Sequence, residues 1–79
     1  MTKTIDTHLF IEIILSEGAS FLASIELEGI SIEYYTCHRG SGKRVPIITS
    51  DEFITTSTAE GLLILLGMES LADRLFQKT

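Results

Sequence analysis

Cys37, His38 and His8 carry the side chains of this chain that can act as a nucleophile, a general base or a soft metal ligand. A catalytic cysteine needs a base within hydrogen-bond distance. His38 follows Cys37 directly, and neighbouring residues of a regular strand point to opposite faces, which places His38 badly for that role. His8 is expected on the Cys37 face but two strands away, about 10 Å in a sheet. Because no C-x-x-C or H-x-x-x-H spacing exists either, we predict no catalytic, metal or cofactor site and no enzymatic activity.

Glu12 and Glu33 form the second arrangement that could do chemistry. In the sheet predicted below they lie on one face with Ser24 between them, about 10 Å apart. Two carboxylates at such a separation can flank a glycosidic bond and its water. An open sheet supplies no cleft to hold a sugar, and a chain of 79 residues has room for one core but not for an enzyme-sized cleft as well. We therefore expect solvated acids and no small-molecule substrate.

The segment HRGSGKR, residues 38–44, gathers three of the six Lys and Arg residues in one loop. It is not a P-loop, because its glycines are too close together and Arg44 stands where that motif has Ser or Thr. Two interpretations remain: a mobile connection, which we favour, or a basic finger that contacts an anionic partner such as nucleic acid. The residues of the second interpretation are the cations Arg39, Lys43 and Arg44, with Tyr34 or Tyr35 as a candidate stacking residue.

Composition restricts the class of protein further. A net charge of −5 gives the body no basic field to recruit nucleic acid, and 44% apolar residues is high for a domain of this size. A single cysteine fits a reducing compartment, and no apolar run reaches the ~18 residues that span a bilayer. The N-terminus lacks the apolar stretch of a signal peptide. We expect one cytoplasmic domain over residues 1–79, with no membrane partner.

Apolar and polar residues alternate in the first half of the chain, as they do in half-buried strands. The pattern predicts strands over residues 8–16, 20–28 and 30–37, joined by a turn and by a two-residue loop at Glu28-Gly29. Both connections pair apolar with apolar residues, which predicts a three-stranded antiparallel meander with that face buried. The pairs are Leu15–Phe21, Ile13–Ala23 and Ile11–Ile25 across the turn, and Leu27–Ile30, Ile25–Ile32 and Ala23–Tyr34 across the loop.

The rest of the chain completes the sheet and covers it. Residues 45–48 predict a fourth strand, which Pro46 confines to an edge because proline cannot donate to a ladder. Residues 49–56 fit either a helical turn capped by Ser50 or a short strand over 52–55.

From Ser57 to Lys78 the apolar residues follow a helical period, and Ser57 with Glu60 forms a capping box. Gly67 weakens this helix by about 1 kcal/mol. We favour one helix through Gly67 over a second helix starting at Met68, because the apolar stripe keeps its phase. The expected fold class is α+β, a three- to four-stranded antiparallel meander with one C-terminal helix packed on one face. The stripe consists of Gly61, Ile64, Leu65, Met68, Leu71, Ala72, Leu75 and Phe76.

Two groups of apolar residues exceed what this fold can bury, and contiguous apolar patches usually mark contact surfaces. One group lies on the outer face of the predicted sheet and the other on the helix, away from its core stripe. We therefore expect an interface with another protein or with a second copy, and acidic residues around it that supply selectivity. The expected partner-binding residues are Phe10, Ile14, Leu22 and Tyr35 on the sheet, Leu62, Leu63 and Leu66 on the helix, and the acids Glu12, Glu26 and Glu33.

In size, acidity and build the chain resembles phage-encoded inhibitors of host defence or DNA-handling machinery, including anti-CRISPR proteins. The resemblance is one of size and composition, and no motif carries it. It implies a small inhibitor or regulator that occupies a partner's working surface, with acidic groups where the partner expects phosphates. The alternative is a small nucleic-acid-binding protein that uses residues 38–44, as a dimer in one version.

Overall fold

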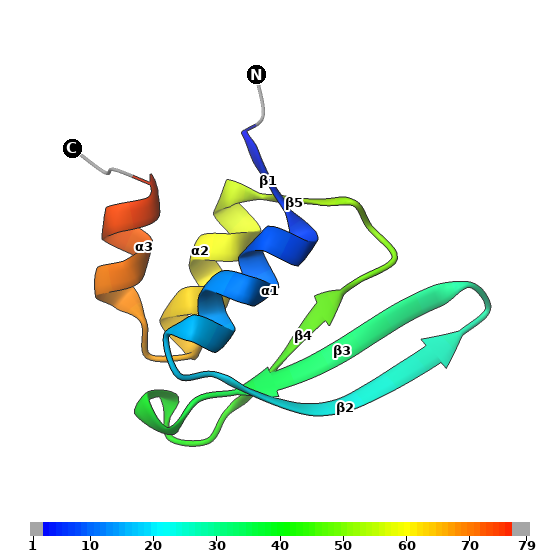
Figure 1. The fold of residues 1–79 in the computed structure, drawn as a ribbon, viewed down its shortest axis with the longest axis horizontal. Helices are drawn as coiled ribbons and strands as arrows, with labels where there is room; N and C mark the ends of the chain where they lie inside the picture. The colour runs from blue at the N-terminus through cyan, green and yellow to red at the C-terminus, as the bar shows by residue number, and fades with distance from the viewer. Residues whose placement is uncertain (1–2, 77–79) are drawn as a thin grey trace.

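The computed structural model describes residues 3–76, which form an α+β fold, so the predicted fold class is confirmed (Figure 1). Two antiparallel sheets occur in this part of the chain: one contains β2, β3 and β4 in that order, and the other pairs β1 with β5. The strands are β1 (Thr4–Asp6), β2 (Ser20–Leu27), β3 (Ile30–Thr36), β4 (Arg44–Ile48) and β5 (Phe53–Thr55), and the helices are α1 (Thr7–Ser16), the 3-10 helix η1 (His38–Gly40), α2 (Thr56–Leu65) and α3 (Glu69–Phe76).

The β2–β3 hairpin has the predicted turn and register. Glu28 and Gly29 both have positive φ, 47° and 84°, the combination of a type I′ turn that matches the twist of its strands. The pairs Leu27–Ile30, Ile25–Ile32 and Ala23–Tyr34 form as expected, and a bulge between Phe21 and Ala23 interrupts the ladder. Pro46 lies in β4, at the edge of the sheet, which confirms the predicted edge strand.

The first predicted strand is wrong, because most of residues 8–16 form the helix α1. The Asp6 carboxylate caps this helix by accepting a hydrogen bond of 2.9 Å from the Leu9 amide. Six of the nine residues 8–16 are apolar, and the polar ones, His8, Glu12 and Ser16, are spaced by four, so the helical and strand periods both fit the segment. The helical spacing decides which side chains are buried. The pairs predicted across the first turn therefore do not form, and the buried residues of α1 are Thr7, Phe10, Ile11 and Ile14.

The C-terminal helix is split, so the prediction of one continuous helix is also wrong. Gly67 has a φ of 78°, and the Met68 amide donates to the Leu63 carbonyl at 2.8 Å, a six-to-one bond that ends α2. The N-cap of α2 is Thr55, whose side chain accepts from the Thr58 amide, and not Ser57. Of the two alternatives for residues 49–56, the short strand is correct, as β5. The predicted helix end at Lys78 lies outside the described residues.

The core lies between the helices and one face of the β2–β3–β4 sheet (Figure 1). That face is not the predicted one: it carries Tyr35 paired with Val45 and Glu33 paired with Ile47, whereas the predicted face carries Ile32 and Tyr34. Both faces of β4 carry apolar residues, but the core face of β3 carries Ser31 and Glu33, so the alternation in β3 pointed to the wrong face. The largest side chains of the core that are under 2% exposed are Phe10, Ile14, Ile47, Leu63, Leu66, Met68 and Val45.

Candidate functional site

The structure places the candidate chemical residues on different elements. Cys37 is buried, His38 begins η1, and His8 is exposed on α1, so the predicted strand position of His8 is wrong. Among residues 3–76 no three His, Cys, Asp or Glu residues are grouped so that they could hold a metal ion. None of the helices in the same range is long and apolar enough to cross a bilayer.

The predicted row of carboxylates is broken as well. Glu12 lies exposed on α1, and only Ser24 and Glu33 are paired across strands. Glu33 instead accepts a hydrogen bond of 2.7 Å from the hydroxyl of Tyr35, a residue that is 3% exposed. The ring of Tyr35 packs edge-on against the ring of Phe21, with the two ring centroids 5.6 Å apart. Burial, then the hydrogen bond to Glu33 and the charge of that carboxylate, raise the pKa of Tyr35 to about 12. This pair has a structural role under the sheet.

Most of the predicted contact residues belong to the core, so they cannot form an exposed patch. The helix α1 turns Phe10 and Ile14 inward, and Tyr35 lies on the core face of β3. The helix α2 buries Leu62 and Leu63, whereas Ile64 and Leu65, which were predicted for its core stripe, are exposed. Leu22 is the exception, at 45% exposure. The residues for which the predicted exposure is wrong are Phe10, Ile14, Tyr35, Leu62, Leu63 and Leu66, all under 9% exposed.

The apolar surface lies instead on the face of the sheet turned away from the core. We define the outer face as the residues that share one side of β2, β3 and β4 through the observed register, in which Ile25 pairs with Ile32 and Ile32 with Ile48. Four of its side chains are 40–62% exposed. The outer face comprises Ala23, Ile25, Leu27, Ile30, Ile32, Tyr34, Pro46 and Ile48.

The hairpin explains why this face is uncovered. β2 and β3 extend beyond the helices as an arm (Figure 1), and all eight residues of β2 are exposed. The sequence predicted this apolar face and its register, but it expected the C-terminal helix to cover it. Residues such as Leu27, Ile30 and Ile48 were therefore missed as contact candidates. The available signal was β4, which has apolar residues on both of its faces.

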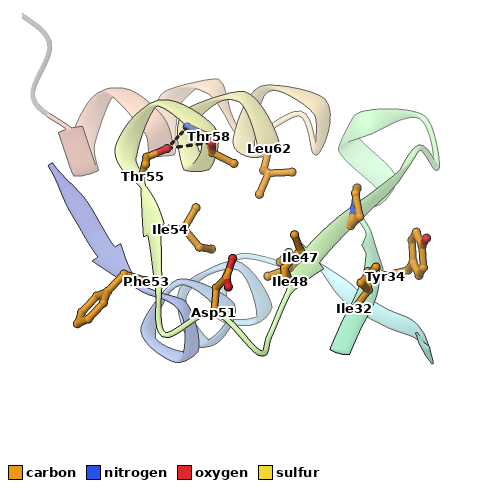
Figure 2. Close-up of a pocket in the computed structure, with 11 residues that line it drawn as sticks. Ile32, Tyr34, Ile47, Ile48, Asp51, Phe53, Ile54, Thr55, Thr58 and Leu62 are labelled. Carbon is orange, nitrogen blue, oxygen red and sulfur yellow. Dashed lines mark hydrogen bonds between the residues drawn. The ribbon is translucent and has the colours of Figure 1, made fainter. Parts of the chain in front are cut away.

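A groove of about 650 Å³ continues the outer face toward β5 and the start of α2. Figure 2 shows Ile32 and Tyr34 on one side of it and Phe53 on the other, with Asp51 between them. Phe53 is 54% exposed. We treat this groove as part of the same surface, because four residues of the outer face help to line it: Ile32, Tyr34, Pro46 and Ile48.

A second hollow of about 530 Å³ opens at the other end of the arm. It is lined by Leu22, Ala23, Ile25, Tyr34 and Arg44. Arg44, exposed on β4, therefore lies beside apolar residues of the outer face. The acids Glu26 and Glu28 lie near the β2–β3 turn, which we call the tip of the arm. Arg44 lies at the end that joins the body, which we call its foot, so the tip is acidic and the foot is basic.

The loop 38–44 is tied to the body and does not project as a free finger. A guanidinium nitrogen of Arg39 donates to the Glu17 carbonyl at the end of α1, and the backbone of Gly40 packs against the end of α2. Lys43 and Arg44 remain exposed. These contacts hold the η1 part of the loop against the body, and the choice between a mobile connection and a basic finger stays a prediction.

Fold and surface together define a small α+β protein with a projecting hairpin arm and a half-exposed apolar sheet face. Comparison of the chain with protein-family models, with curated proteins and with solved structures finds no match. The surface itself is therefore the basis for any functional proposal.

Proposed function

We propose that this protein is a non-catalytic protein–protein interaction module that docks through its outer face. The observation that supports the proposal is the side-by-side exposure of Ile25, Leu27, Ile30 and Ile48 across three paired strands. Isolated exposed apolar residues are ordinary, but a contiguous set on one face usually marks a contact surface. The adjoining groove with Phe53 extends that set and gives it a concave part.

The magnitude of the burial fits a binding surface. Six side chains of this region are 40–62% exposed, which is equivalent to about three complete apolar side chains. Burying them on a partner would contribute about 5–9 kcal/mol, against an association cost of about 4–15 kcal/mol. Polar contacts at the rim must therefore add to the affinity. The six residues are Leu22, Ile25, Leu27, Ile30, Ile48 and Phe53.

Acidic residues beside the outer face supply such contacts and give selectivity. Glu26 and Glu28 are exposed at the tip of the arm, so a partner with cations near its apolar patch fits this end. We extend the proposal to an inhibitor or regulator of the phage type that occupies a partner's working surface. The free, buried Cys37 fits a reducing compartment such as the cytoplasm.

The test compares proteins retained by three tagged forms of the chain. Ile48→Asp places a charge in the outer face, whereas Leu9→Asp places the same charge on α1 at a similar exposure, 48% against 44%. We expect a partner that the wild type and Leu9→Asp both retain and that Ile48→Asp loses, while circular dichroism shows all three folded. Equal retention by the two variants would refute docking through the outer face.

A second candidate is nucleic-acid binding through residues 38–44, which the exposed side chains of Lys43 and Arg44 support. Arg39 supports it less, because its guanidinium is engaged by the Glu17 carbonyl. The triple variant Arg39/Lys43/Arg44→Ala should then abolish a salt-dependent affinity for an oligonucleotide. Salt-independent or unchanged binding would remove this candidate.

A further inference from the structure

The free edge of β2 is an unusual feature for a strand at the edge of a sheet. It is eight residues long, and its single charged residue is Glu26. Natural edge strands are usually shortened, covered, or protected by lysine or proline, because their unpaired backbone groups accept another strand. The opposite edge, β4, carries Pro46 and is only five residues long. The backbone of β2 is therefore the better template for an added strand.

The regular part of β2 is complementary to itself. The bulge leaves residues 23–27 as its unbroken segment. If two such segments run antiparallel with Ile25 opposite Ile25, Ala23 lies opposite Leu27 and Ser24 opposite Glu26. Every pair then joins residues of the same face, and the two outer faces become continuous. Moving the register so that Glu26 faces Glu26 would oppose like charges, which is unfavourable.

The same register also brings complementary groups of the two copies together at both ends of the arm. Leu27, 62% exposed, would lie beside Ala23 of the other copy, at the mouth of the hollow that Leu22 and Tyr34 line. Glu28 would come next to Leu22 of the other copy, where Arg44 lines that hollow. The acidic tip of each arm thus meets the basic foot of the other. Because the arms project beyond the helices (Figure 1), the two helical bodies stay at opposite ends.

From this we propose that a second copy of the chain pairs antiparallel along β2, centred on Ile25, to form a six-stranded sheet with one continuous outer face. The inference deepens the proposed function, on which it rests, because pairing along the β2 edge joins the outer faces of two copies into one larger docking surface and leaves that surface uncovered. It also assigns two contacts across the interface, Leu27 in the partner copy's hollow and Glu28 with the partner copy's Arg44.

The test uses opposite charges at the centre of the proposed interface. Ile25→Lys and Ile25→Glu each place like charges against each other in a homodimer, and each should raise its dissociation constant about 100-fold. Mixing the two variants in equal amounts should restore the dimer, because position 25 then opposes position 25 with opposite charges. Sedimentation velocity and light scattering measure both effects, and Leu9→Lys is the control at an exposed site on α1.

A crosslink provides a test that does not depend on charge. Residues opposite each other in antiparallel strands have Cα atoms about 4.5–5.5 Å apart, which a disulfide spans. Ile25→Cys should therefore oxidise to a covalent dimer, whereas Leu9→Cys should not, and Cys37 is buried in both. A wild-type chain that stays monomeric, or a dimer unaffected by Ile25→Lys, would overturn this inference. Retention of a partner lost by Ile48→Asp would still support the proposed function, so the two failures are distinguishable.

Discussion

Gly40 and Gly67 hold the basic loop and the α2–α3 turn in direct backbone contact. A Cβ built on Gly40 would lie 2.4 Å from the Leu65 carbonyl oxygen, and one built on Gly67 would lie 2.5 Å from the Arg39 carbonyl and 2.8 Å from the Gly40 nitrogen. Real Cβ atoms do not approach backbone this closely. The contact holds residues 38–40 against the turn between α2 and α3, and a side chain at either glycine would collide with backbone atoms.

Replacing Gly67 with alanine should lower the free energy of unfolding by about 2–4 kcal/mol, because the new side chain both strains a positive φ and collides with the Arg39 backbone. Gly42→Ala is the matched control, since its φ is 74° but its Cβ would meet nothing within 4 Å. It should cost about 1–2 kcal/mol, the strain alone. Urea unfolding followed by circular dichroism measures both. Equal losses for the two variants would contradict the backbone contact.

Gly61, inside α2, is expected to respond to alanine in the opposite way. It lies exposed inside α2 at an ordinary helical φ, with open space where a Cβ would be. Gly61→Ala should therefore raise the free energy of unfolding by about 0.5–1 kcal/mol through its higher helix propensity. The same urea titration measures this gain. A loss of stability would mean that another group occupies the space beside Gly61.

Raising the pH should destabilise the protein through Tyr35. Its pKa is about 12 in the folded chain, against about 10 in the unfolded chain. Because the folded state holds this proton more tightly, the contribution is complete below pH 10 and is lost as the pH rises toward 12, about 2 kcal/mol in all. Urea unfolding at pH 9 to 11.5 measures the loss. Tyr35→Phe should lose less over this range; an identical pH profile would refute the assignment.

The sequence specified the hairpin well because its signals are local. The Glu28-Gly29 turn and the pairing of Ile25 with Ile32 follow from residues adjacent in the chain, and both are observed. Pro46 restricted its strand to an edge for a similarly local reason, the missing amide. Elements that are determined by their own neighbouring residues, such as this turn and this edge strand, could therefore be predicted.

The first helix and the buried face of the sheet depend on tertiary packing, which explains why they were mispredicted. The polar residues within 8–16 are spaced by four, which fits a helix and a strand alike, and packing in the core then selected the helix. Gly67 is itself a local signal that can end a helix, but the apolar stripe keeps its phase through this residue and favoured the continuous alternative. The predicted contact residues on these elements were consequently placed on the surface when they form the core.

Ile47 and Ile48, adjacent on β4, give a direct test of which face of the sheet is buried. Ile47 is 1% exposed and packs in the core, whereas Ile48 is 44% exposed on the outer face. Ile47→Ala should lower the free energy of unfolding by about 2–5 kcal/mol, because it leaves a cavity. Ile48→Ala should cost under about 1 kcal/mol in the isolated chain, because that side chain already contacts water. A larger loss for Ile48→Ala would show that the helices cover the outer face. The proposed docking surface would then be part of the core, and no partner could bind to it.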